Sequence, residues 1–250
     1  MTTNDDGVHP VGPAVLRITR AATNCYLLDT ADGPVLIDAG LPRAWPLLVR
    51  ALETVGLSPD DLVSVYLTHG HFDHVGMCDR LVREHHVPLH VHDDDVALVR
   101  HPYRYAHERP RWRYPIRFPA AIPALARMTA AGALSVHGVD AHGDVRPGAR
   151  LLGGLVPIAT PGHTRGHCAF FWPEQGVLFS GDALVTFDPY TAAAGPRVVA
   201  RAATADASTA LRALDALAAT RARLVLPGHG RPFEEGAEAA AAAARRTPVA

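Results

Sequence analysis

The first ninety residues alternate short apolar runs with segments of helical spacing. Apolar and β-branched residues, broken by polar pairs and glycine, predict antiparallel strands at 14–20, 24–30 and 34–40. Residues 44–56 carry apolar side chains at helical spacing and end on Gly56, which suits the position just after a helix. The remaining elements predicted here are strands at 63–68 and 87–92, with a helix at 77–86 between them. This alternation is typical of a layered α/β fold.

Residues 93–150 depart from this pattern because they are rich in proline, arginine and aromatic residues. Helical spacing recurs within them at about 93–100 and 119–131, and we interpret the whole stretch as an inserted lid. Beyond it, the pattern predicts strands at 155–160, 168–172, 176–181 and 222–228 and helices at 204–220 and 234–246. We therefore predict a single domain over residues 1–250 that carries the lid as an insertion.

Composition narrows the class of protein. Of the 250 residues, 48% are hydrophobic and 20% are charged, so a packed core is expected rather than disorder. The net charge of −1 produces no overall field that would draw the protein to nucleic acid or to an anionic membrane. All 24 basic residues are arginine, so no lysine can serve as a nucleophile.

Three features predict a cytoplasmic location. Cys25, Cys78 and Cys168 are odd in number and form no CxxC pair, which fits a reducing compartment. The polar, acidic start of the chain lacks the pattern of a signal peptide. No apolar run approaches the roughly 20 residues that cross a bilayer, so we expect no membrane span.

The segment "THGHFDH" directly follows the strand predicted at 63–68 and concentrates metal-binding side chains. His69, His71, Asp73 and His74 lie within six residues, and Gly70 lets the backbone turn tightly between them. Neutral imidazole nitrogens and carboxylate oxygens are common metal ligands. Because one ion needs three or four protein ligands, we expect His69 and His71 to bind one ion and Asp73 and His74 to bind a second.

Three further donors follow predicted strand ends, where α/β proteins build their sites. They are His163 in "ATPGHTRGH", Asp182 in "FSGDAL" and His229 in "VLPGHG". The complete set of five histidines and two aspartates can hold two metal ions with an open position. His167, four residues after His163, is a further neighbour to consider. The other nine histidines are interpreted as surface or satisfied core residues: His9, His85, His86, His90, His92, His101, His107, His137 and His142.

The ordered series "LIDAG", "THGHFDH", "TPGHT", "SGD" and "PGHG" resembles the motifs of the metallo-β-lactamase-fold hydrolases, from about residue 24 to residue 231. The resemblance implies a four-layer αββα sandwich with two metal ions at one edge. It implies a first ion on His69, His71 and His163, a second on Asp73, His74 and His229, and Asp182 bridging both. Asp38 would support the site from behind rather than bind metal.

A histidine-rich ligand set favours two zinc ions, with manganese, cobalt or iron as alternatives. Asp182 is usually missing from the true β-lactamases that this fold resembles, whereas Asp182 and "TPGHTRGH" look more like glyoxalase II, lactonases and thioesterases. We therefore predict a metal-dependent hydrolase that cleaves an ester, thioester or lactone of a small molecule. The alternatives are a phosphodiesterase at the same site, a mononuclear iron persulfide dioxygenase, and a metal-binding protein without turnover.

The expected mechanism follows from charge. A hydroxide that bridges the metal ions would attack the substrate carbonyl while a metal polarises the carbonyl oxygen. Asp73 can accept and return the proton, and Tyr190 is a candidate donor to the oxyanion, with a packed loop aromatic as the alternative interpretation.

The insertion carries six arginines between residues 100 and 117, interleaved with tyrosine and tryptophan. One interpretation is a lid that binds an anionic or acyl-thioester substrate, because arginine suits phosphate and carboxylate. The other is a solvated face with packed aromatics. We expect no nucleic-acid partner, and the sequence does not indicate the oligomeric state.

Overall fold

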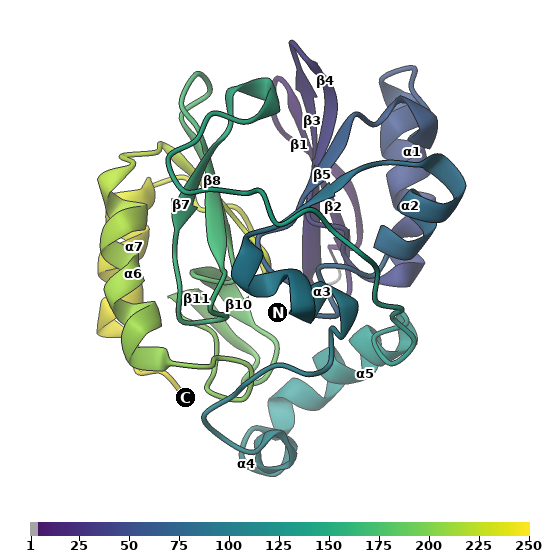
Figure 1. Ribbon diagram of the computed structural model, residues 1–250. Helices are drawn as coiled ribbons and strands as arrows, with labels where there is room; N and C mark the ends of the chain where they lie inside the picture. The colour runs from purple at the N-terminus through teal and green to yellow at the C-terminus, as the bar shows by residue number, and fades with distance from the viewer. Residues whose placement is uncertain (1–4) are drawn as a thin grey trace. The chain divides into compact units, whose positions relative to one another are not determined.

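The computed structural model describes residues 5–250 and divides them into two compact units (Figure 1). The first unit comprises the residues up to 104 together with 127–145, and the second comprises 105–126 and 146–250. Each unit has its own sheet and is described by itself below. The single domain over residues 1–250 stays a prediction.

The first unit is built on a six-stranded sheet in the order β1-β2-β3-β4-β5-β6. Its strands are β1 (Gly7–Gly12), β2 (Val15–Arg20), β3 (Thr23–Thr30), β4 (Gly33–Ile37), β5 (Ser64–Tyr66) and β6 (Leu89–His90). The first four strands are antiparallel neighbours, while β5 pairs in parallel with both β4 and β6. The five strands predicted for this half are confirmed, with bounds that differ by one to three residues. Strand β1 was not predicted, because this partly exposed edge strand carries too weak an apolar alternation.

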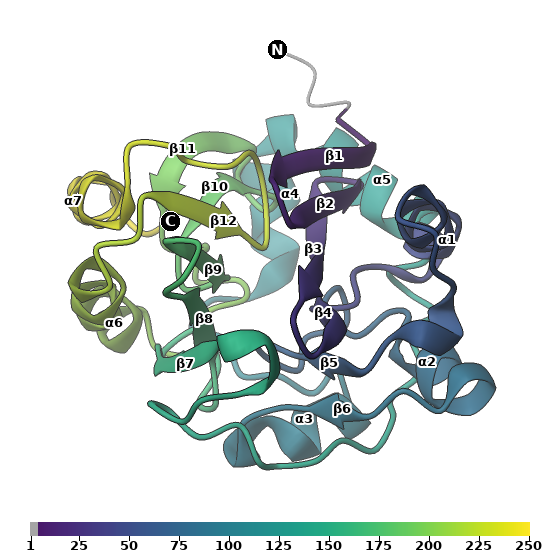
Figure 2. The ribbon, with the colours of Figure 1, turned by 90° about the horizontal axis from the view of Figure 1, so that it is seen from above.

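Helices α1 (Trp45–Thr54) and α2 (Cys78–His85) flank this sheet (Figure 2). Leu48, Ala51 and Leu52 form the buried face of α1 and join the core of the first unit. Gly56 follows the helix with a φ of 76°, the left-handed conformation that glycine adopts readily, as predicted. Helical periodicity was therefore sufficient to locate both helices.

The insertion contains short helical elements and is divided between the two units. Its elements are η3 (Asp93–Asp95), α3 (Val96–Arg100), η4 (Arg111–Arg113), α4 (Tyr114–Arg117), η5 (Pro119–Ala121) and α5 (Ile122–Ala130). The helical segments expected at about 93–100 and 119–131 are confirmed. Residues 105–126 belong to the second unit, and 127–145 return to the first.

The second unit contains a four-stranded sheet in the order β12-β9-β8-β7. Its strands are β7 (Val156–Ala159), β8 (Cys168–Trp172), β9 (Val177–Gly181) and β12 (Leu224–Pro227), all at predicted places. Helices α6 (Ala207–Ala219) and α7 (Ala237–Arg246) flank them (Figure 2). A separate antiparallel pair, β10 (Val185–Asp188) and β11 (Ala193–Arg197), was not predicted, because β10 is short and β11 contains Gly195 and Pro196.

The loop after β7 packs tightly against the start of α6. Gly162 has a φ of 129°, and a Cβ at this position would lie 2.2 Å from the backbone nitrogen of Ala210. The Gly162 carbonyl accepts a hydrogen bond of 2.9 Å from the backbone N–H of Asp206, the residue that caps α6. Glycine therefore fixes how closely this loop, which carries His163, approaches the helix.

Replacing Gly162 with alanine should destabilise the protein more than the same change at Gly148. Gly148 also has a positive φ, of 80°, but nothing lies within 4 Å of its missing Cβ. Both variants should lose about 1–2 kcal/mol through the left-handed backbone. Gly162→Ala should lose a further 1–3 kcal/mol, roughly, through overpacking. Urea unfolding measures the difference, and equal losses would contradict the close packing on α6.

Candidate metal centre

The "HGHFDH" loop begins directly after β5 and is almost completely buried. The backbone N–H of Gly70 donates to Asp95 Oδ2 at 3.0 Å, and a Cβ on Gly70 would lie 2.8 Å from the backbone nitrogen of Val99. The N–H of His74 donates to the carbonyl of His71 at 2.9 Å. These constraints gather the four predicted ligands of the first unit: His69, His71, Asp73 and His74.

A buried carboxylate orients two of these histidines. Asp38 lies at the end of β4, and its Oδ2 is 2.9 Å from His74 Nδ1. The Thr68 hydroxyl lies 2.9 Å from the same oxygen, and the Thr68 N–H donates to Oδ1 at 2.8 Å. An ionised carboxylate can only accept, so both His74 Nδ1–H and the Thr68 hydroxyl donate to it.

The same network sets the tautomer of His69. Because the Thr68 hydroxyl donates its one proton to Asp38, it must accept from His69 Nδ1, which lies 3.0 Å away. His69 and His74 therefore carry their protons on Nδ1, and their Nε2 atoms have the lone pair that a metal ligand needs. Support of this kind behind ligating histidines is a usual feature of metal sites.

The second unit gathers its three predicted ligands at the ends of β7, β9 and β12. Strands β9 and β12 are parallel, so Asp182 and His229, which follow them, lie at one edge of the sheet. Asp182 Oδ2 lies 3.4 Å from His163 Nε2 and 3.3 Å from His229 Nε2. All three side chains are buried.

The tautomer of His163 makes this arrangement informative. The Thr204 hydroxyl donates to the Val199 carbonyl at 2.8 Å, so it accepts from His163 Nδ1 at 3.3 Å. With its proton on Nδ1, His163 faces the Asp182 carboxylate with the lone pair of Nε2. Two electron-rich atoms at 3.4 Å repel each other unless a second proton or a metal cation lies between them. The donor set and its charge therefore fit a metal ion.

His167 has a different function in the second unit. Its Nε2 accepts a hydrogen bond of 3.0 Å from the backbone N–H of Asp182, and its Nδ1 lies 2.8 Å from the Thr160 hydroxyl. The lone pair of Nε2 is thus used to hold the Asp182 backbone. His167 is therefore a positioning residue. The sequence suggested that it lies near the site, but it did not reveal the contact with the Asp182 backbone.

Burial separates these histidines from the others. Of the 15 histidines, six are buried, namely the five predicted ligands and His167. The nine that were interpreted as ordinary surface or core residues are all partly or fully exposed. Because buried imidazoles need specific partners, the burial pattern itself points to the predicted set.

Tyr190 lies just after β10 and is held by its neighbours. Its backbone N–H donates to Asp188 Oδ1 at 2.9 Å, and its hydroxyl lies 3.2 Å from that of Tyr105. Burial raises the pKa of the Asp188 carboxyl, while the Tyr190 N–H and the charge of His229 lower it. The Asp188 carboxyl therefore holds the backbone of Tyr190 in place.

The sequence did not reveal the threonines that support the site. Thr68 and Thr160 stand immediately before the "HGH" and "PGH" motifs, so their position was a usable signal. Thr204 and Asp95 are distant in sequence from the histidine loops they support. No local pattern could have identified these two.

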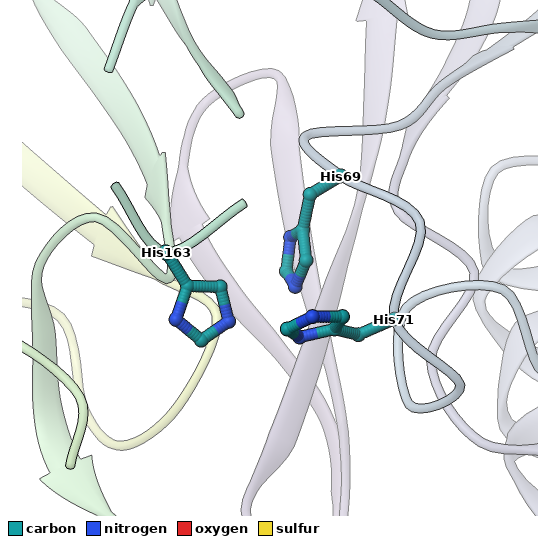
Figure 3. A group of neighbouring side chains, drawn as sticks. All are labelled: His69, His71 and His163. Atoms are coloured by element: carbon teal, nitrogen blue, oxygen red, sulfur yellow. The ribbon is translucent and has the colours of Figure 1, made fainter. Parts of the chain in front are cut away.

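Three groups of these residues could each hold a metal ion. The groups are His69, His71 and His163; His69, His74 and Asp182; and Asp73, His74 and His229. Figure 3 draws the first group, which is His69, His71 and His163.

The three cysteines, Cys25, Cys78 and Cys168, are all buried thiols. Burial raises the pKa of the Cys25 and Cys78 thiols, which therefore stay protonated. Among the residues from 5 onward, no helix is long and apolar enough to cross a membrane.

Comparisons with known proteins agree with this geometry. The chain is 29% identical over 228 residues to the probable metallo-hydrolase YflN of Bacillus subtilis, covering 86% of this chain and 83% of that protein. It is 26% identical over 189 residues to the N-acyl homoserine lactonase AiiA of Bacillus thuringiensis subsp. kurstaki, covering 66% of this chain and 62% of that protein.

Solved structures extend the comparison to the fold. The structure of TTHA1623 in a di-iron-bound form superposes with a TM-score of 0.64 at 28% identity, covering 93% of this chain and 96% of that one. The predicted fold class is thereby confirmed. The family model of the metallo-beta-lactamase superfamily matches residues 18–229, and the chain therefore belongs to that superfamily of metal-dependent hydrolases.

Proposed function

We propose that the protein holds two divalent metal ions and that it hydrolyses an ester, thioester or lactone of a small molecule. The first ion is assigned to His69, His71 and His163. The second is assigned to Asp73, His74 and His229, with Asp182 as the bridging ligand. Asp38 takes no ion and instead holds His74 and, through Thr68, His69.

The observation that carries this proposal is the pair formed by His163 and Asp182. The hydrogen bond from His163 Nδ1 to Thr204 directs the lone pair of Nε2 at a carboxylate oxygen 3.4 Å away. A cation between them removes the repulsion. The Nδ1 protons of His69 and His74 are fixed in the same way, which supports a site prepared for metal.

Bound divalent ions would supply a Lewis acid and lower the pKa of a water molecule to near neutrality. Asp73 is proposed to accept a proton from that water and to pass it to the leaving group. Tyr190 is proposed to donate to the substrate oxyanion. If Tyr105 donates in the contact between the two tyrosine hydroxyls, the proton of Tyr190 can point to the substrate.

The substrate class rests on two considerations. The first is that an aspartate, Asp182, is present at the proposed bridging position, a feature in which the chain resembles lactonases and thioesterases rather than the true β-lactamases. The second is that a lactonase is among the relatives. Zinc is proposed as the metal because five of the seven ligands are histidine, although the di-iron form of TTHA1623 makes iron the first alternative. A cytoplasmic location belongs to the same proposal, as does the phosphodiesterase alternative.

Replacing Thr68 with valine should weaken metal binding. Valine keeps the shape but removes the hydroxyl that joins His69 to Asp38. We expect roughly 10–100-fold lower zinc affinity in chelator competition. Thr54→Val removes a hydroxyl that bonds only to the Ala51 carbonyl in α1 and is the matched control. Equal affinities of the two variants would contradict the assigned support.

Hydrolysis should depend on Asp182 and should favour carbonyl substrates. The assay compares a lactone, a thioester, an aryl ester, a phosphodiester and a β-lactam with metal-loaded protein. Loss of a residue that hydrogen-bonds a metal ligand typically lowers activity roughly 10–100-fold. Because Asp182 is proposed as a ligand itself, Asp182→Asn should lower kcat/KM by more than that. Asp215→Asn, at an exposed carboxylate, should leave it unchanged.

Each outcome of this assay is decisive for the substrate class. Hydrolysis of the phosphodiester alone would replace the proposal by the phosphodiesterase. Inertness of the metal-loaded protein toward the whole panel would refute carbonyl hydrolysis. One iron per chain with oxygen uptake on persulfides would instead assign the dioxygenase.

A further inference from the structure

Exposed apolar side chains are concentrated in one segment of the second unit. The described residues expose seven large hydrophobic side chains, and three of them, Trp112, Ile116 and Ile122, lie within eleven residues. Trp112 is 66% exposed and Ile116 is 74% exposed. The two stand four residues apart along η4 and α4, so they share one helical face, while Tyr114 between them is buried.

The same segment carries charge that its surroundings do not neutralise. Residues 105–126 contain Arg109, Arg111, Arg113 and Arg117 and one acidic residue, Glu108, which pairs with Arg201. Some other surface arginines do have carboxylate partners: Arg80–Glu84, Arg83–Asp79, Arg100–Asp140, Arg150–Glu174 and Arg245–Asp215. Among residues 5–250, the four arginines of this segment form no such ion pair.

Three of the four guanidinium groups lie instead over aromatic rings. Arg111 is 4.0 Å from the ring centre of Tyr105, Arg113 is 5.2 Å from that of Trp112, and Arg117 is 5.6 Å from that of Phe118. These contacts keep the positive charges beside the exposed apolar side chains without cancelling them. We call the surface formed by Trp112, Ile116, Arg113 and Arg117 the Trp112 face.

We propose that the Trp112 face binds an anionic lipid surface. In segments that bind at a membrane interface, tryptophan and isoleucine enter the headgroup region while neighbouring arginines contact lipid phosphates. The net charge of −1 for the whole chain hides this local excess of positive charge. The binding is peripheral and reversible, because the face is short.

Two other occupants fit less well. A symmetric contact with a second copy would bring the face against itself and place unpaired arginines opposite one another. Nucleic acid would match the arginines but would leave Ile116 without an apolar environment, although Trp112 could stack on a base. A lipid surface satisfies both kinds of side chain.

The test is sedimentation of the metal-loaded protein with vesicles. Vesicles of phosphatidylcholine and phosphatidylglycerol in equal amounts should bind it, vesicles of phosphatidylcholine alone should bind it weakly, and added salt should release it. Arg113→Gln and Arg117→Gln should each lower the affinity roughly fivefold. The double variant Trp112→Ala/Ile116→Ala should bind least. Trp112→Phe should still bind but lose most of the blue shift in tryptophan fluorescence.

The matched control lies elsewhere on the same unit. Leu152 is 42% exposed and Arg150 is a surface arginine, so Leu152→Ala/Arg150→Gln removes one apolar side chain and one charge and should bind as the unchanged protein does. Equal binding to both vesicle types, no binding, or unchanged binding of the double variant would overturn the proposal. The proposal would also be overturned if the protein self-associates or binds single-stranded RNA and only the variants of the Trp112 face abolish that binding. Vesicle binding needs no turnover, so its failure leaves the proposed hydrolysis untouched.

Discussion

The buried carboxylate of Asp38 is the group on which the first half of the site depends. A charge removed from water must be matched by hydrogen bonds, and Asp38 receives them from His74 and Thr68. Its backbone adopts a φ of 58°, a conformation that costs about 1–3 kcal/mol for a residue with a side chain. The parallel pairing of β4 and β5 places Asp38 beside the loop that it organises.

In the second unit, threonine hydroxyl groups orient the buried histidines. Thr204 fixes the proton of His163, and Thr160 fixes that of His167, which in turn holds the backbone of Asp182. In both units, a threonine therefore decides which nitrogen of a neighbouring histidine carries the proton. Rotamers locked in this way prepare ligands before any ion arrives, which lowers the cost of ordering them.

Local pattern predicted most elements and the whole candidate ligand set. Helix α1 carries helical periodicity because one face is buried, and strands β2, β3 and β4 stand out as short apolar runs because most of their residues are buried. Strands β1, β10 and β11 were missed because edge strands and Gly-Pro segments lack that signal. The contacts that support the ligands could not be predicted from local sequence patterns, since Thr68 and Asp38 are 30 residues apart and His163 and Thr204 are 41 residues apart. The arginines between residues 109 and 117 were evident in the sequence, but their lack of carboxylate partners among residues 5–250 was not.

The central claim is that histidines and aspartates in loops at strand ends hold two metal ions, with Asp182 as the bridging ligand. Anomalous diffraction from crystals of the metal-loaded protein, recorded at the zinc, iron and manganese absorption edges, tests it most directly. The account predicts two peaks at one edge, one beside His69, His71 and His163 and one beside Asp73, His74 and His229, with Asp182 bound to both. A single peak, or peaks at other residues, would contradict it.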